Sequence, residues 1–166
     1  MRRNALRIVP LRQAHVPACQ AIVAASDPWT RLRENIDFRA MLRDRSVKAF
    51  VCIAANGVAG FILFLPGPVF ARGGYLRAIG VSPEYRRQGI GSMLLSHAEK
   101  LVSLRASHFF LCVSSFNREG QVFYRRQGYR KVGSLPGFIT PRASEYIFWK
   151  PLKTSSRRLK PAATKS

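Results

Sequence analysis

An arginine- and glycine-rich stretch, RRQGIG at residues 86–91, holds the residues whose types and spacing point most directly to chemistry. It follows an apolar segment that ends at Val81, and it opens a stretch with helical periodicity. The first amides of a helix have no partner within the helix, and the helix dipole favours negative charge there. Glycine lacks a Cβ, so the backbone can wrap closely round an anion and present several N–H donors to it. The stretch therefore predicts a phosphate-binding turn, to which Arg86 and Arg87 add positive charge.

Two familiar nucleotide-binding motifs are excluded at this turn. A dinucleotide-binding fingerprint requires a third glycine at the position of Leu94, and a P-loop requires a Gly-Lys-Ser/Thr sequence, which does not follow. A tight strand-to-helix turn that binds nothing has the same glycine pattern. The residues of the turn alone therefore leave phosphate binding and a plain turn as alternatives.

The spacing of Arg86, Gly89 and Gly91, R-x-x-G-x-G, resembles the acyl-CoA-binding motif of the GNAT superfamily of N-acyltransferases. A second motif supports the resemblance, since Asn117 and the phrase FYRRQGY at residues 123–129 resemble the family's N-x6-F-Y-x3-G-F/Y pattern. Together the motifs and their surroundings cover roughly residues 6–150. The resemblance implies an α/β (α+β) fold of the acyl-CoA N-acyltransferase type, in which helices flank both faces of a mixed, mostly antiparallel sheet of six or seven strands.

The resemblance also implies an activity, the direct transfer of acetyl from the cosubstrate acetyl-CoA to a primary amine of a small molecule, a protein N-terminus or a lysine. The turn at residues 86–91 would hold the pyrophosphate of CoA. Backbone amides around Ile79 and Gly80 would polarise the thioester carbonyl, and Asn117 would meet the pantetheine arm. The cofactor-binding residues implied in this way are Ile79, Gly80, Val81, Arg86, Arg87, Gln88, Gly89, Ile90, Gly91, Ser92 and Asn117.

Tyr124 corresponds to the position at which many family members donate a proton to the CoA sulfur. Reference pKa values are about 10 for tyrosine and about 8.5 for a thiol, so a tyrosine is protonated at neutral pH and can supply this proton. The alternative for Tyr124 is an aromatic side chain buried beside Phe123. For Asn117 the alternative is an N-cap whose side-chain oxygen accepts from the first turn of the following helix, with or without a ligand contact.

A general base is missing from the place where the family would put it. Many members carry a glutamate on the strand before the phosphate turn, but residues 74–82 include no carboxylate and only one charged residue, Arg77. Glu84 lies past the strand, and Glu145 cannot be placed from the sequence. The base therefore stays unassigned, with a water chain or an already unprotonated acceptor as the default. The absent carboxylate leaves a second class open, an acyl-CoA-binding or regulatory module without catalysis.

Length and charge bound the organisation of the chain. Its 166 residues fit one domain at residues 1–150, followed by a basic tail at residues 151–166 whose composition predicts disorder. The 28 lysines and arginines against 8 acidic residues give a net charge of +20, which attracts anionic partners. CoA is such a partner, and the charge alone leaves a nucleic-acid- or ribosome-associated protein as a third class.

The cysteines and histidines indicate neither disulfides nor a metal site. Cys19, Cys52 and Cys112 are odd in number, widely spaced and set in apolar runs, which favours reduced thiols and a cytoplasmic location. No histidine or cysteine has metal-ligand spacing, so no metal is expected. Arg7 and Arg12 interrupt the apolar start of the chain, which argues against a signal peptide.

Hydrophobic periodicity and turn signals predict the elements that must position these motifs. Strands are expected at residues 6–11, 51–55, 58–65, 74–81, 108–113, 129–133 and 144–149, and helices at residues 14–25, 30–45, 89–104 and 117–127. Residues 49–71 carry no charge and are long enough to span a bilayer, but Asn56-Gly57 signals a hairpin within them. The Pro-Gly-Pro sequence at residues 66–68 is expected to end that run in a turn.

Two further predictions concern the edges of the site. Gly80, near the end of its strand, indicates a β-bulge or a close backbone approach. In the family resembled, the first helix-loop-helix borders the acceptor site, so Trp29, Glu34 and Asp37 are candidate acceptor contacts. The alternatives for these three residues are a half-buried aromatic side chain and solvated helix charges.

Overall fold

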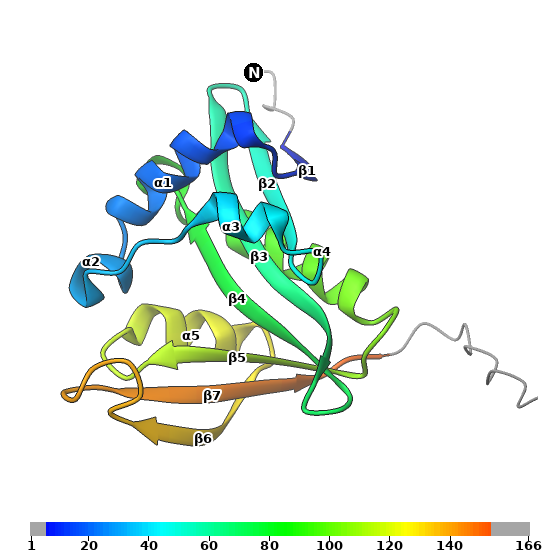
Figure 1. Ribbon diagram of the computed structural model, residues 1–166, viewed down its shortest axis with the longest axis vertical. Coiled ribbons are helices and arrows are strands. Elements are labelled where there is room, and N and C mark those ends of the chain that lie inside the picture. Colours follow the sequence, from blue (N-terminus) through cyan, green and yellow to red (C-terminus); the bar gives the residue numbers. More distant parts are fainter. Residues whose placement is uncertain (1–5, 154–166) are drawn as a thin grey trace, which may run out of the picture.

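Seven strands form one mixed sheet in the computed structural model, which describes residues 6–153 (Figure 1). The strands are β1 (Arg7–Pro10), β2 (Lys48–Ala54), β3 (Gly57–Val69), β4 (Gly73–Val81), β5 (His108–Ser114), β6 (Arg130–Pro136) and β7 (Ser144–Pro151). Their order is β1-β2-β3-β4-β5-β7-β6, and of these described pairs β4 and β5 alone run parallel. The expected mixed, mostly antiparallel sheet is confirmed. The predicted tail lies, from residue 154 on, outside the described residues.

Helices cover both faces of the sheet, in two groups (Figure 1). They are η1 (Gln13–His15), α1 (Val16–Ala24), α2 (Trp29–Leu32), α3 (Phe38–Arg43), η2 (Pro83–Tyr85), α4 (Ile90–Val102) and α5 (Arg118–Arg126). One core joins α1 and α3 to the face of β2 and β3 that carries Phe61 and Leu63. The other joins α4 and α5 to the face that carries Ile62 and Phe109. Within residues 6–153, no helix has the length and apolar character needed to cross a membrane.

The helix expected at residues 30–45 is instead two short helices, α2 and α3. Arg33 takes a left-handed conformation with φ of 53°, which ends α2. Asp37 then starts α3, because its side chain accepts a hydrogen bond of 2.9 Å from the Ala40 amide. The apolar periodicity continues across both helices and does not reveal the break between them.

The uncharged run at residues 49–71 forms the β2-β3 hairpin, as its Asn56-Gly57 signal predicts. The turn expected at residues 66–68 was wrong, because β3 continues through these prolines to Val69. A register shift between Leu65 and Val69 lets the strand absorb them at the end of its pairing with β4. The chain reverses just beyond, at residues 70–72.

Strands β4 and β5 part halfway along their length, which opens the middle of the sheet. They pair from Gly73 to Leu76 with His108 to Leu111, and beyond this point β4 stays with β3 while β5 stays with β7. Figure 1 shows the two strands diverging toward the ends of their arrows. The register also shifts at Arg77, so a bulge lies there rather than at Gly80.

Side chains alternate between the two faces along β5. Phe109, Leu111 and Val113 pack into the core under α4. Cys112 and Ser114 therefore lie on the opposite face, the face that α1–α3 cover farther along the sheet. Figure 1 shows none of the described helices over this face of β5, β7 and β6.

Candidate active site

The turn between β4 and α4 presents a row of free backbone amides. The first hydrogen bond of α4 runs from the Met93 amide to the Gly89 carbonyl at 3.0 Å. The amides from Arg87 through Ser92 donate to no acceptor among the described residues. Arg87 and Gly89 are both left-handed, with φ of 60° and 81°, which turns the backbone around one point. The predicted phosphate-binding turn therefore has the geometry that an anion requires.

Gly89 and Gly91 of the motif are glycines for different structural reasons. A Cβ on Gly89 would meet no atom within 4 Å, so the space beside this N-cap is open. A Cβ on Gly91 would lie 3.4 Å from the Phe123 ring of α5. Gly89 thus serves the turn conformation and the open space, whereas Gly91 lies where α4 approaches α5.

Side chains of the turn fix it to its neighbours. Arg86 donates from Nη2 to Ser26 Oγ at 2.8 Å and from Nε to the Val81 carbonyl at 3.4 Å, which ties the turn to the end of α1. Gln88 donates to the Glu84 carbonyl at 3.2 Å.

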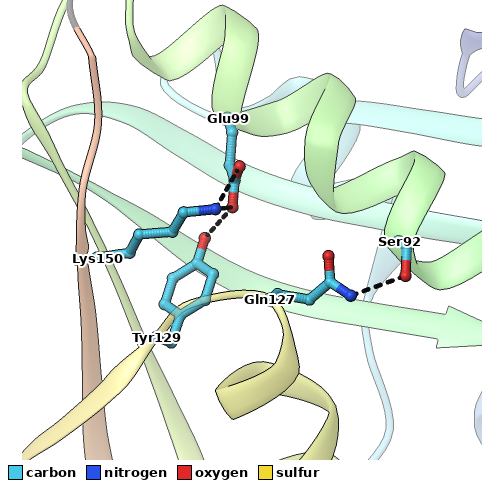
Figure 2. Close-up of polar contacts among 5 residues, drawn as sticks. All are labelled: Ser92, Glu99, Gln127, Tyr129 and Lys150. Atoms are coloured by element: carbon cyan, nitrogen blue, oxygen red, sulfur yellow. Dashed lines mark hydrogen bonds and ion pairs between the residues drawn. The ribbon is translucent and has the colours of Figure 1, made fainter.

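Two further predicted residues lie on α4 itself. Ile90 is buried in the core, and Ser92 accepts a 2.9 Å hydrogen bond from Gln127 at the end of α5 (Figure 2). Of the predicted set, Arg87 is exposed and makes no hydrogen bond from its side chain to the described residues.

The open edge of β4 offers two more amides. The Ser82 amide donates to the Ala59 carbonyl at 2.9 Å, and in an antiparallel pair the hydrogen-bonded residues alternate. The Gly80 amide therefore faces β3, while the amides of Ile79 and Val81 face the side from which β5 has parted. For Gly80 itself the structure gives a packing reason, because a Cβ there would lie 2.6 Å from the Phe61 ring.

Tyr124 lies on α5 among aromatic rings, with ring centroids 5.2 Å from Phe123, 5.9 Å from Tyr129 and 6.3 Å from Phe148. Burial raises the pKa of its phenol well above the ordinary value. Its hydroxyl hydrogen-bonds to no described residue. Among the described residues, His97 Nε2 is the one side-chain N or O atom that has neither solvent contact nor a hydrogen-bond partner. The Tyr124 hydroxyl has no partner either, so it keeps contact with solvent. Tyr124 is thus both a packed aromatic residue and a protonated group with a free donor.

Asn117 is the N-cap of α5, because its Oδ1 accepts a 2.9 Å hydrogen bond from the Gly120 amide. A Cβ on Gly120 would lie 2.7 Å from Asn117 Nδ2, so the cap depends on that glycine. The side-chain nitrogen of Asn117, Nδ2, makes no hydrogen bond to the described residues, while its backbone amide donates to the Ser114 carbonyl at 2.9 Å. The capping role is confirmed, and the predicted contact with pantetheine stays a prediction.

The three acceptor-side candidates have different surroundings. Asp37 caps α3, and Trp29 packs 5.9 Å from Phe61 at the edge of the core. Glu34 is exposed, and its negative charge adds to the raised pKa of Glu145 on β7. Arg31 of α2 lies 5.4 Å from the centre of the Phe116 ring, which brings this segment to the end of β5. Of the three candidates, Glu34 is the one whose charge acts on Glu145.

Glu145 is the carboxylate that the sequence could not place. It lies opposite Ser114 in the β5-β7 pair, on the same face of the sheet as Cys112, where it is buried, and accepts a 2.6 Å hydrogen bond from the Ser114 hydroxyl. Burial raises the pKa of its carboxyl, an effect that the Ser114 hydrogen bond opposes. A glutamate within the apolar strand SEYIFW was the available signal, but its neighbours became known only with the strand register.

Comparison with known proteins agrees with this geometry. The model of the Acetyltransferase (GNAT) family matches residues 10–129. An N-alpha-acetyltransferase of Saccharolobus solfataricus is 28% identical over 122 residues, which span 67% of this chain and 73% of that protein.

Two solved structures share the fold at low identity. Ard1 from Thermoplasma volcanium has a TM-score of 0.75 and 22% identity, over 90% of this chain and 99% of the other. An aminoglycoside 6'-N-acetyltransferase complexed with coenzyme A has a TM-score of 0.73 and 17% identity, over 90% and 98%.

The family match contains the whole glycine turn at residues 86–91, the cap Asn117 and Tyr124. It also spans the parallel β4-α4-β5 unit, in which the strands part beside the free amides. The sequence motifs, the sheet and the family match agree with one another. The chain belongs to the GNAT family of acetyltransferases and is an N-acetyltransferase.

Proposed function

We propose that this protein transfers the acetyl group of acetyl-CoA directly to a primary amine. The observation that carries the proposal is the row of free amides from Arg87 through Ser92 at the start of α4. Such amides, with the positive end of the helix dipole, favour a bound anion. A CoA pyrophosphate supplies one, and the open space beside Gly89 accommodates it.

The rest of the cosubstrate follows the opening between β4 and β5. The amides of Ile79 and Val81 are donors aimed at this opening, where they would polarise the thioester carbonyl. The aminoglycoside acetyltransferase with the same fold is described as a complex with coenzyme A, which supports this class of ligand. Asn117 and Tyr124, one after the other along α5, would face the pantetheine arm and the sulfur.

In the proposed reaction the amine nitrogen attacks the thioester carbonyl carbon, and the carbon–sulfur bond breaks. The attacking nitrogen loses one proton to solvent, and the departing thiolate takes a proton from the Tyr124 hydroxyl, which regains it from solvent. The acceptor approaches over the face of β5 and β7 that no described helix covers. The reaction needs a nucleophilic nitrogen with a proton to lose, a requirement that a primary amine meets.

Binding is tested by thermal unfolding with acetyl-CoA, adenosine and pantetheine. A ligand that binds only the folded chain at 100 times its Kd stabilises it by about 2.7 kcal/mol. For a chain of this length that raises Tm by about 5–10 °C. Each fragment alone should do much less, because neither includes the whole pyrophosphate linkage, and an equal shift with either fragment would contradict the proposed site.

Two glycine variants locate the binding site. Gly89→Ala should remove the acetyl-CoA shift, because alanine disfavours φ of 81° and its methyl group enters the open space. Gly57→Ala is the matched control, since Gly57 has φ of 116° and equally open surroundings but lies in the β2-β3 hairpin. That variant should keep the full shift. Loss of the shift in both variants would indicate a general loss of stability.

Turnover is tested by thiol release with a panel of amines, namely polyamines, amino acids, aminoglycosides and peptides with free N-termini. Release that depends on the amine, with the acetylated amine found by mass spectrometry, is the expected result. Thiol release at the same rate without any amine would indicate thioester hydrolysis and would contradict direct transfer.

A further inference from the structure

Among the buried residues of the described range 6–153, Glu145 is the single acidic side chain, with 4% of its surface exposed. One carboxylate oxygen, Oε1, accepts the 2.6 Å hydrogen bond from Ser114. Oε2 has no hydrogen-bond partner among the described residues. Among the described residues, the one side-chain N or O atom that lacks both solvent contact and a hydrogen-bond partner is His97 Nε2. Oε2 of Glu145 therefore keeps some contact with solvent. Glu145 is therefore a buried carboxylate with one oxygen, Oε2, that no described residue binds.

No cation of the described chain balances this carboxylate, although the sequence contains 28 lysines and arginines. The described salt bridges join Arg31 to Asp27 and Lys150 to Glu99. Burying a charge without a partner is costly, and proteins normally pair such groups. A positively charged ligand at Oε2 would supply the partner that Glu145 lacks.

The surroundings of Glu145 come from four other parts of the fold. Tyr75 of β4 and Cys112 of β5 are near neighbours, and for both residues burial raises the pKa, with the charge of Glu145 adding to the effect. Glu34 contributes its charge from the segment after α2. Strand β6 contributes an apolar neighbour, Leu135, opposite Glu145 in register. The titratable groups that act on Glu145 are thus neutral or negative, and none of them competes with a cationic ligand.

We infer that Glu145 binds the ammonium group of the acceptor and takes its proton, so that the amine becomes the nucleophile. This inference rests on the proposed function and assigns it both a base and a substrate class, a primary amine that arrives positively charged. One proton passes from the ammonium nitrogen to Oε2, and the neutral amine then attacks the thioester. After attack the nitrogen loses its second proton as the thiolate gains one, and Glu145 returns its own proton to solvent.

Ser114 and Glu34 support this role in different ways. The Ser114 hydroxyl holds Oε1, which leaves Oε2 directed at the ligand, so Ser114 is a positioning residue. Glu34 is exposed and adds a second negative charge near the first. Two neighbouring carboxylates favour acceptors that carry more than one positive charge.

The alternative is that Glu145 only ties β7 to β5 through Ser114. Glu145→Gln separates the two roles, because an amide oxygen still accepts from Ser114 but does not take a proton at neutral pH. We expect kcat/KM at pH 7 to fall by about 10²- to 10⁴-fold in this variant, the range for loss of a general base. Ser114→Ala keeps the carboxylate of Glu145 but removes the hydrogen bond that orients it, so its kcat/KM should fall by less.

The pH dependence of the defect is the decisive readout. Without a base the variant can use only the fraction of acceptor that is already unprotonated. Its deficit relative to the wild type should therefore be largest at neutral pH and shrink as the pH approaches the pKa of the acceptor amine. Glu99→Gln, which removes a carboxylate on α4 outside this face, should show no deficit at any pH in that range.

Each outcome of the comparison decides something. Wild-type turnover in Glu145→Gln, with the acetyl-CoA thermal shift intact, overturns this inference and leaves the proposed function standing. A deficit that is constant with pH also overturns it. If Glu145→Gln does not fold, Glu145→Met, similar in volume and without a proton acceptor, must show the same pH-dependent loss. A wild-type protein that acetylates none of the amines overturns both proposals.

Discussion

Replacing Tyr124 by phenylalanine tests the proposed general acid with little disturbance of the fold. The ring keeps its packing against Phe123, Tyr129 and Phe148, and the hydroxyl hydrogen-bonds to no described residue. No buried partner is therefore left unsatisfied. We expect the free energy of unfolding to change by no more than about 0.5 kcal/mol, as for a substitution that breaks no contact.

Turnover should respond quite differently. Loss of a general acid lowers the rate by about 10²- to 10⁴-fold, which corresponds to about 3–5 kcal/mol of transition-state stabilisation. The affinity for acetyl-CoA should stay close to that of the wild type, because the hydroxyl acts mainly as the carbon–sulfur bond breaks. The assay is thiol release with the amine that the panel identifies, together with calorimetric titration of acetyl-CoA.

Tyr129→Phe is the matched control for this variant. Tyr129 belongs to the same aromatic cluster, but its hydroxyl donates a 2.9 Å hydrogen bond to Glu99, which also pairs with Lys150 (Figure 2). Its loss should cost about 1.5–3 kcal/mol of stability, the range for a hydrogen bond to a charged group, and leave kcat nearly unchanged. Near wild-type turnover for Tyr124→Phe, when chemistry limits the rate, would refute the acid role and leave thiolate protonation to solvent.

Three further substitutions test other parts of the structure. Gly120→Ala should displace the Asn117 cap and destabilise the chain by about 0.5–2 kcal/mol in urea unfolding, and an unchanged midpoint would contradict the cap's importance. Gly80→Ala should cost about 1–3 kcal/mol, because its methyl group would lie 2.6 Å from the Phe61 ring, and crystallography of the variant would show which side moves. Glu145→Gln should be more stable than the wild type at neutral pH. The folded-state pKa of Glu145 is raised, so its contribution to stability is greatest at low pH and is lost as pH rises through that pKa. Thermal melts from pH 4 to 8 should show the gain growing with pH, whereas a constant difference would contradict the raised pKa.

The sequence predicted the elements whose boundaries carry their own local signals. Asn117 begins α5, and Gly128 follows its end with φ of 89°, so both ends were visible in the residue types. The helix α4 was equally clear, because its apolar stripe starts directly after the glycine turn. The motif residues lie on these two helices or just beyond their ends, and the helices approach each other where Gly91 meets the Phe123 ring.

The missed features depend on tertiary structure. Arg33 is left-handed without being glycine or asparagine, so nothing in its residue type marks the end of α2. The bulge at Arg77 changes which face the following residues of β4 occupy. It thereby decides which backbone amides of β4 point toward the gap between β4 and β5. Glu145 meets Ser114 only through the β5-β7 register. The alternation of side chains along a strand predicts which face each residue occupies. The partner strand and its register depend on how the whole sheet assembles.

The charges of the site also explain how a chain with net charge +20 can serve a cationic acceptor. At physiological ionic strength the Debye length is about 8 Å, so most of the exposed arginines act weakly on a group held near Glu145. The free amides of the turn lie at the start of α4, on the face that packs α4 and α5. Glu145 lies on the opposite face. In the proposed reaction, anionic CoA and a cationic amine are therefore held by different faces of one sheet, and they meet only where β4 and β5 have parted. Glu145→Lys should then abolish use of cationic amines while acetyl-CoA still raises Tm, and loss of both in a variant that circular dichroism shows to be folded would mean that the two sites are not separate.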